Sequence, residues 1–255
     1  TAEDAALKDL CDTMNRCRDM VITYQFGEQT IKLEGETICT WILGSTQEGL
    51  VDVNYDMAAA FVKSMADQFD TAGKTRAFHT TTGKDLNLTG PYGWQIDQAG
   101  ETASLIAMIR TGQSQLREPL YSKKAQDRTT DWGKTYVEID LTNQHVYMYQ
   151  DGNLAWDAPC VTGNVSKNYT TPEGIYSLTY KQTDRVLRGE KKADGTYEYE
   201  SHVDYWMPFN GGIGLHDASW RSKFGGTIYQ YGGSHGCINL PSGKAKTLYD
   251  MVYTG

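Results

Sequence analysis

The sequence lacks several features that would assign it at once to a common protein class. Its longest apolar run, Met57 to Val62, is far shorter than the roughly 18 residues of a membrane span. No internal repeat or low-complexity segment is present. Lysine and arginine form no cluster beyond short pairs such as Lys123-Lys124, and the net charge is −8. Binding to nucleic acid or to an anionic membrane surface is therefore not expected.

Cysteine is sparse and irregularly spaced. The five cysteines form no C-x-x-C pair of the kind found in zinc sites and redox motifs. Because five is an odd number, at least one thiol stays free even if the others pair. We expect four of them to be buried free thiols, namely Cys11, Cys17, Cys39 and Cys160. The fifth, Cys237, lies in a distinctive local sequence.

What the chain does contain indicates a folded, β-rich protein. Its 26 glycines and 17 tyrosines, against only 6 prolines, suit strands joined by tight turns. A hydrophobic content of 39% with 22% charged residues is typical of globular proteins rather than disordered ones. The length of 255 residues allows one large domain or two ordinary ones.

The first half mixes helical and strand patterns. Apolar residues at helical spacing predict three helices, at residues 5–20, 55–69 and 97–110. Strand patterns cover residues 21–26 and 30–33. Asp97 is a suitable N-cap for the last helix, and Gly112 suits its end. The apolar pattern lapses between residues 122 and 134, so we predict an α+β domain over residues 1–130 and a second domain over 131–255.

The second half is dominated by strands. Alternation of apolar and polar residues predicts strands at residues 135–141, 145–149, 154–159, 174–180, 197–201 and 203–208. Asp151-Gly152 is a hairpin signal, and residues 189–195 read as a solvated loop. Helix returns only at the end, where Ser242 is expected to cap a segment that reaches Val252. We predict a mostly antiparallel, β-sandwich-like domain with a C-terminal helix.

Residues 232–240, which read Gly-Gly-Ser-His-Gly-Cys-Ile-Asn-Leu, hold the strongest candidate for chemistry. Glycines let the backbone approach a ligand closely, and the N–H groups around Cys237 can face a developing oxyanion. We interpret Cys237 as a nucleophile whose pKa is lowered by a nearby imidazole and local N–H groups. The alternative is an inert thiol in the core.

Two histidines compete for the role of general base. His235 lies two residues from Cys237, so on an extended strand both side chains project to the same side, and its alternative role is structural. His216 can approach from another strand, with Asp217 or a neighbouring backbone carbonyl fixing its tautomer. Zinc held by His216, His235 and Cys237 is the rival chemistry, for which the sequence offers no convincing fourth ligand.

One or two rings of the aromatic run Tyr205–Phe209 could line a cleft, although a core role is the default for such residues. The candidates for substrate contact are Tyr205, Trp206, Tyr231 and Asn239.

The cysteine motif resembles that of the L,D-transpeptidases of bacterial cell-wall synthesis, the YkuD-like family. In that family a histidine is followed some two dozen residues later by Ser/Thr-His-Gly-Cys, a hydrophobic residue and Asn or Arg, which here are His216 and residues 234–239. Residues 161–163 (Val-Thr-Gly) and 171–176 (Thr-Pro-Glu-Gly-Ile-Tyr) match earlier landmarks of the family. The resemblance covers residues 134–253.

The first half resembles the domain that precedes this catalytic domain in Gram-positive members and is regarded as peptidoglycan-binding. Its landmarks are residues 90–97 (Gly-Pro-Tyr-Gly-Trp-Gln-Ile-Asp) and 117–119 (Arg-Glu-Pro). Family members finish with a strand after the last helix, whereas this chain stops at Gly255. The resemblance also implies an enzyme outside the cytoplasm at the cell wall, held to the membrane only by an N-terminal anchor that is missing here.

The resemblance implies a cysteine acyltransferase without metal or organic cofactor, acting on peptidoglycan stem peptides. Cys237 would attack the carbonyl between the third residue and D-Ala of a donor tetrapeptide stem. His216 would be base and then acid, with Asp217 orienting it, and Ser234, His235 and Gly236 would form the loop and oxyanion hole. The third-residue amine of an acceptor stem, or its bridge, would complete a cross-link, and carbapenems would acylate the thiol.

Two alternatives stay open at this point. An L,D-carboxypeptidase would use the same residues with water as the acceptor. A non-catalytic wall-binding protein would keep the first domain and need no reactive thiol.

Overall fold

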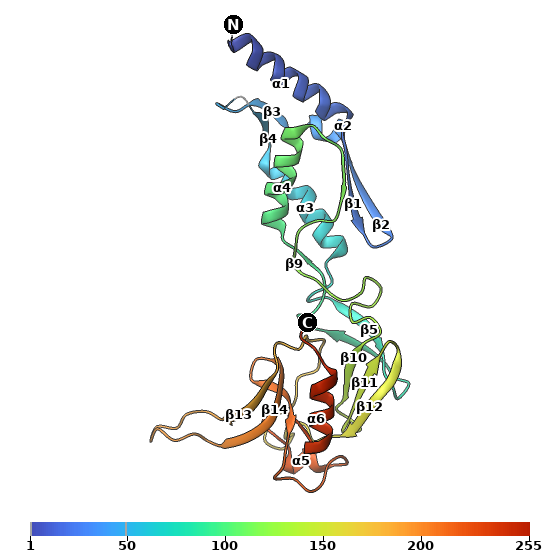
Figure 1. The fold of residues 1–255 in the computed structure, drawn as a ribbon, viewed down its shortest axis with the longest axis vertical. Coiled ribbons are helices and arrows are strands. Elements are labelled where there is room, and N and C mark those ends of the chain that lie inside the picture. Colours follow the sequence, from blue (N-terminus) through green and yellow to red (C-terminus); the bar gives the residue numbers. More distant parts are fainter. Residues whose placement is uncertain (1, 49) are drawn as a thin grey trace. The chain divides into compact units, whose positions relative to one another are not determined.

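The computed structural model describes residues 2–48 and 50–255, and the chain within it forms two compact units (Figure 1). The first unit comprises Thr1–Ala72 and Gly93–Asp131, and the second comprises Gly73–Tyr92 and Trp132–Gly255. Residues 73–92, which the sequence division placed in the first domain, therefore belong with the second unit. Within the described part of the chain, no helix is both long and apolar enough to cross a membrane.

The first unit is a mixed α/β domain, as predicted. Its helices are α1 (Ala2–Asp19), α2 (Gly35–Cys39), α3 (Tyr55–Phe69) and α4 (Gln98–Thr111). Its strands are β1 (Val21–Phe26), β2 (Gln29–Glu34), β3 (Ile42–Ser45), β4 (Val51–Val53), β7 (Gln95–Ile96), β8 (Gln115–Arg117) and β9 (Tyr121–Lys123). β1 is the central strand of a three-stranded sheet, antiparallel to β2 and parallel to β8.

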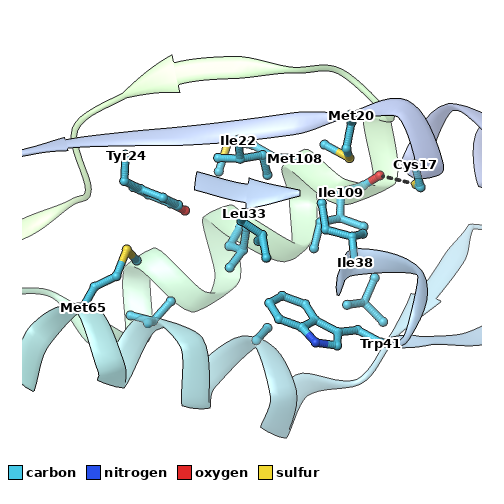
Figure 2. Packing of buried hydrophobic residues seen from close by; sticks show 14 of the residues in the cluster. Cys17, Met20, Ile22, Tyr24, Leu33, Ile38, Trp41, Met65, Met108 and Ile109 are labelled. Carbon is cyan, nitrogen blue, oxygen red and sulfur yellow. Dashed lines mark hydrogen bonds between the residues drawn. The ribbon is translucent and has the colours of Figure 1, made fainter. Parts of the chain in front are cut away.

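The core of this unit lies where the helices meet the sheet (Figure 2). Ile22, Leu33 and Ile109 are almost completely buried, and the thiol of Cys17 donates to the carbonyl of Ile109 at 3.2 Å (Figure 2). The predicted caps of α4 are confirmed. Asp97 accepts from the N–H of Gly100 at 3.0 Å, and Gly112 ends the helix with a φ of 62° that glycine adopts without strain.

The second unit has two main sheets, a separate hairpin and two helices. Its strands are β5 (Thr75–His79), β6 (Asp85–Thr89), β10 (Tyr136–Asp140), β11 (His145–Gln150), β12 (Asn153–Pro159), β13 (Gln182–Arg188), β14 (Glu200–Asn210), β15 (Ile213–Asp217) and β16 (Ile238–Leu240). Its helices are α5 (Ile228–Gly232) and α6 (Ser242–Met251).

The two main sheets share one core with the last helix. β10, β11 and β12 form an antiparallel sheet, and β13 to β16 form another in which only β15 and β16 run parallel. The core draws on both sheets and on α6, with members such as Val146, Met207, Ile238 and Leu248. This is the predicted β-rich, mostly antiparallel architecture ending in a helix.

The hairpin β5–β6 packs on the β10 side of this unit. The carboxylate of Glu138, only 6% exposed, accepts from the backbone N–H of Thr81 at 3.0 Å and from its hydroxyl at 2.7 Å. The ring of Phe78 meets those of Trp132 and Tyr136 edge-on. A buried carboxylate satisfied in this way ties residues 73–92 to the second unit.

Several local predictions are wrong. Residues 174–180 form no strand, because the segment makes only single bonds to its neighbours, such as the N–H of Thr179 to Pro208 O. The strands predicted at 197–201 and 203–208 are one strand, β14. Pro241 rather than Ser242 is the N-cap of α6. All five cysteines are free, but Cys11 and Cys39 are exposed rather than buried.

Candidate active site

The parallel pair β15–β16 brings the two halves of the motif together. His216 on β15 is the register partner of Asn239 on β16, and Cys237 directly precedes β16. Trp206 on the neighbouring strand β14 pairs with His216, and its ring lies 5.9 Å from the imidazole. The same tryptophan belongs to a small buried cluster with Cys237 and Val203. Two predicted residues 21 positions apart in sequence thus share one neighbour.

The loop before Cys237 is held by hydrogen bonds from within. The hydroxyl of Ser234 donates to the carbonyl of Cys237 at 2.6 Å and accepts from the N–H of Gly236 at 3.0 Å. Gly236 has a φ of +116°, and a Cβ there would lie 3.1 Å from the side chain of Ile213. Only glycine adopts this conformation without strain, which explains its place in the motif.

Thr171 also holds this loop through hydrogen bonds, a role that was not predicted from the sequence. Its hydroxyl accepts from the N–H of Gly163 at 3.0 Å and donates to the carbonyl of Gly236 at 2.7 Å. Three sequence landmarks, at residues 161–163, 171–176 and 234–239, therefore meet at one hydroxyl. The signal in the sequence was its place in the family landmark at residues 171–176.

Burial dominates the chemistry of Cys237. The side chain is 8% exposed, and its sulfur lies 3.5 Å from the carbonyl oxygen of Gly212. Burial raises the pKa of the Cys237 thiol to about 11, and a backbone bond from Gly214 opposes the rise only in part. The predicted lowering of this pKa is therefore wrong for the resting site, because desolvation of the thiolate outweighs the local N–H groups.

His216 is buried and has a defined hydrogen-bond partner at each ring nitrogen. Nδ1 lies 2.8 Å from the backbone carbonyl of Asp217, and Nε2 lies 3.0 Å from the side-chain nitrogen of Asn239. The carboxylate of Asp217 instead accepts from the N–H of Tyr205 at 2.8 Å. Of the two predicted ways of orienting His216, the structure thus shows the backbone carbonyl. Burial lowers the pKa of His216, Asp217 opposes this, and the charge of Arg221 adds to it.

Asn239 is not placed to contact a substrate, contrary to the prediction. It is 2% exposed, and its Oδ1 accepts from Nε of Arg221 at 2.8 Å while its Nδ2 faces His216. Its backbone pairs in both directions with Val161. Arg221 is a further neighbour of the site that sequence reasoning missed.

His235 is exposed and lies beside two aromatic rings. Its imidazole lies 4.5 Å from the ring of Tyr169 and 4.6 Å from that of Tyr199. Its Nε2 is 3.5 Å from a carboxylate oxygen of Glu198. Burial first, and then the charges of Cys237 and Glu198, raise the pKa of Tyr199. These contacts favour the structural interpretation of His235.

The remaining substrate-contact candidates differ in exposure. Trp206 is 2% exposed, whereas Tyr205 is partly buried and its ring packs against Tyr249 of α6. Tyr231 is 79% exposed and borders a hollow of about 260 Å³. The hollow is lined by Val165, Ser166, Tyr229, Gln230 and Tyr231. Next to Val165, which lines the hollow, the N–H of Asn164 donates to the carbonyl of Ser234 in the loop before Cys237 at 2.9 Å.

The rival zinc site gains no support from this geometry. The ring nitrogens of His216 face the carbonyl of Asp217 and the amide of Asn239, and neither residue is among the predicted ligands. Across residues 2–48 and 50–255, no group of three or more His, Cys, Asp or Glu side chains could hold a metal ion.

Comparison with protein families matches each half of the chain. Residues 134–255 match the YkuD family, described as the L,D-transpeptidase catalytic domain. Residues 11–117 match the family described as a putative peptidoglycan binding domain. No curated protein matches the sequence significantly.

Two solved structures resemble nearly the whole chain. Ldtfm, as its avibactam carbamoyl enzyme, is 31% identical with a TM-score of 0.77, and the match covers 97% of this chain and 96% of that one. A cysteine-to-serine mutant of the Enterococcus faecium L,D-transpeptidase is 30% identical with a TM-score of 0.76, covering 96% of this chain and 97% of that one.

Proposed function

Because the chain belongs to the L,D-transpeptidase family with a YkuD catalytic domain, we propose that it cross-links peptidoglycan through Cys237. The donor is a tetrapeptide stem, cleaved between its third residue and D-Ala. The observation that carries this proposal is a buried thiol and a buried imidazole that share Trp206 as a neighbour, with the imidazole already held at Nδ1.

Acylation begins with transfer of the thiol proton to His216. At neutral pH the thiol is protonated and the imidazole is neutral, because burial disfavours the charged form of each. Nε2 of His216 takes the proton as sulfur attacks the donor carbonyl, and the imidazolium then returns it to the leaving amine of D-Ala. A thioester remains on Cys237.

We assign the oxyanion hole to backbone N–H groups of the loop Ser234–Cys237. The N–H of Gly236 is bonded to Ser234 Oγ, and that of Ser234 to the carbonyl of Thr162. The N–H groups of His235 and Cys237 are therefore the donors best suited to a developing oxyanion, and the internal bonds of Ser234 and Gly236 keep them in position.

The second half-reaction transfers the acyl group to an amine. The third-residue side chain of an acceptor stem, or a bridge attached to it, attacks the thioester and yields the cross-link. The first unit, which matches a peptidoglycan-binding family, would hold the enzyme on its polymeric substrate at the cell wall. An L,D-carboxypeptidase would use the same residues with water as the acceptor, and it is the second candidate.

Covalent labelling tests the acylation step. The purified chain is incubated with a carbapenem, and its intact mass is measured. We expect one adduct, mapped by digestion to the peptide that carries Cys237, and none in Cys237→Ala. The exposed Cys11 and Cys39 serve as internal controls, because accessibility alone would label them first. No adduct, or one that persists in Cys237→Ala, would contradict the proposal.

Muropeptide products separate the two candidates. Incubation with tetrapeptide-containing muropeptides gives cross-linked dimers if the acceptor is an amine and trimmed tripeptides alone if it is water. Dimer formation that stops in both Cys237→Ala and His216→Ala supports transpeptidation by the assigned residues.

A further inference from the structure

A chain of hydrogen bonds leads from Arg221 to the imidazole of His216. Nε of Arg221 donates to Oδ1 of Asn239 at 2.8 Å, and Nδ2 of Asn239 lies 3.0 Å from Nε2 of His216. At the far side of the ring, Nδ1 lies 2.8 Å from the carbonyl oxygen of Asp217. The mechanism above assigns no task to Arg221 or Asn239.

The chemistry of each group allows only one arrangement of protons along this chain. A guanidinium has donors and no acceptor, so the oxygen of the Asn239 amide must face Arg221. The amide nitrogen then faces His216 and can only donate, so Nε2 must carry a lone pair. Nδ1 therefore carries the single ring proton and donates it to the carbonyl of Asp217. The carbonyl of Asp217 and the amide of Asn239 thus require the same tautomer, and Arg221 holds the amide in the orientation that opposes a proton on Nε2.

The backbone holds this chain in place. Asn239 and His216 are register partners across the parallel strands β15 and β16. Arg221 lies in the turn that follows β15, where its N–H donates to the carbonyl of Ala218 at 3.0 Å. The side chains of His216 and Asn239 are 3% and 2% exposed, so water does not replace a bond that is lost.

The surroundings of His216 are otherwise mostly apolar. The rings of Trp206 from β14 and Trp220 from the following turn each lie 5.9 Å away. The charged groups that act on the imidazole are Asp217, which favours its cation, and Arg221, which opposes it. Arg221 is itself half-buried, and burial lowers its pKa without removing its charge at neutral pH.

We propose that Arg221 is a positioning residue that locks the amide of Asn239 and so keeps His216 as the neutral base with its proton on Nδ1. The proposal rests on the proposed function, in which Nε2 accepts the proton of Cys237. When the S–H bond breaks and the Nε2–H bond forms, the N–H of Asn239 loses its acceptor, because two N–H groups then face each other. The imidazolium is thus destabilised and passes its proton on to the leaving amine.

The test compares Arg221→Met with Arg221→Lys. The first removes both the donor and the charge, whereas the second keeps a donor and a charge. Arg188→Met is the matched control, because Arg188 pairs with Glu200 on the exposed side of β13 and has no contact with Asn239. Circular dichroism and thermal melting establish that each variant is folded.

Two readouts decide the proposal. In 15N-histidine-labelled protein, we expect the ring nitrogens of His216 to report the neutral Nδ1–H ring in the parent and a larger fraction of the cation at pH 6 in Arg221→Met. The acid limb of the pH–rate profile for carbapenem acylation should move to higher pH by about one unit, the size of shift that loss of one nearby charge produces. Arg221→Lys should move it far less and Arg188→Met not at all.

Unchanged tautomer signals and an unchanged acid limb in folded Arg221→Met would overturn the proposal. The 15N signals need no turnover, so they decide the role of Arg221 even if the parent protein is not acylated. Failure of the positioning role is thereby distinguishable from failure of the proposed function.

Discussion

At the scale of single residues, the thiol of Cys237 and the imidazole of His216 are both uncharged in the resting site at neutral pH. A cysteine beside an imidazolium forms an ion pair where the surroundings lower the pKa of its thiol. Here burial raises the pKa of Cys237 and lowers that of His216, so the neutral pair is favoured. In the proposed mechanism the thiolate forms only when His216 takes the proton, and a protonated thiol is less susceptible to oxidation between turnovers.

This leads to a prediction on the pH dependence of Cys237 alkylation. The thiolate fraction of a group with a pKa of about 11 rises about tenfold per pH unit until that pH. We therefore expect the iodoacetamide reaction of Cys237, followed by peptide mapping, to accelerate up to about pH 11. Free cysteine, run in parallel, should level off above its ordinary pKa of about 8.5. A plateau below pH 8 would instead indicate a preformed thiolate–imidazolium pair.

At the scale of secondary-structure elements, the first unit depends on one buried carboxylate on α4. Glu101 is completely buried and joins three elements. It accepts from the hydroxyl of Tyr24 on β1 at 2.7 Å, from the guanidinium of Arg117 on β8 at 2.9 Å and from the N–H of Leu120 at 2.7 Å. Because each oxygen of this buried carboxylate accepts a hydrogen bond, the carboxylate holds the elements that supply the donors in one register.

Replacing this carboxylate should destabilise the first unit. In Glu101→Gln the charge of Arg117 loses its partner, and an amide N–H₂ faces groups that donate. Breaking a buried pair in this way costs about 3 kcal/mol or more. Native-state hydrogen exchange should show amides of β1 and α4 exchanging roughly a hundredfold faster. The exposed Glu36→Gln is the control, and equal exchange rates in both variants would refute this account.

The sequence predicts elements well where a pattern is local and long. The helices α3 and α4 and the hairpin β11–β12 follow from spacing, caps and a turn dipeptide. Residues 174–180 alternate like a strand yet lack a continuous partner, and pairing is a long-range property that alternation does not encode. The same limit applies to β15 and β16. These strands are short, and their parallel pairing joins segments far apart in the sequence.

The candidate site was predictable from the sequence only in part. The Cys237 and His216 motif was visible because its residues have fixed spacing and distinctive chemistry. Thr171 and Arg221 were not recognised, because a hydroxyl and a guanidinium are common side chains whose contacts arise only on folding. The pKa of Cys237 was predicted in the wrong direction, because burial is not visible in a loop rich in glycine.

At the scale of the whole molecule, the two units are not two consecutive stretches of chain. The chain passes from the first unit to the second at residues 72–73, returns at 92–93 and passes again at 131–132. The hairpin β5–β6 is thus an early segment that completes the later unit. Its attachment through Thr81, Glu138 and Phe78 is part of the fold of the second unit.

Weakening that attachment should affect the second unit measurably. Thr81→Val keeps the backbone bond to Glu138 but loses the hydroxyl bonds to Glu138 and to Tyr149, the latter 2.9 Å long. We expect a loss of about 1–2 kcal/mol, seen as a lower melting temperature and faster hydrogen exchange in residues 73–92. Thr75→Val removes only an exposed pair within the hairpin and should cost a few tenths of a kcal/mol. Equal effects would show that the hairpin is not docked through Thr81.

The interrupted path has a consequence for the order of folding during synthesis. The hairpin leaves the ribosome before Glu138 and the strands beside it exist, so it must wait while residues 93–131 complete the first unit. At about 5–20 residues per second this delay lasts on the order of seconds, which is long compared with hairpin formation. During that time the ring of Phe78 lacks the rings of Trp132 and Tyr136 that it contacts in the folded unit.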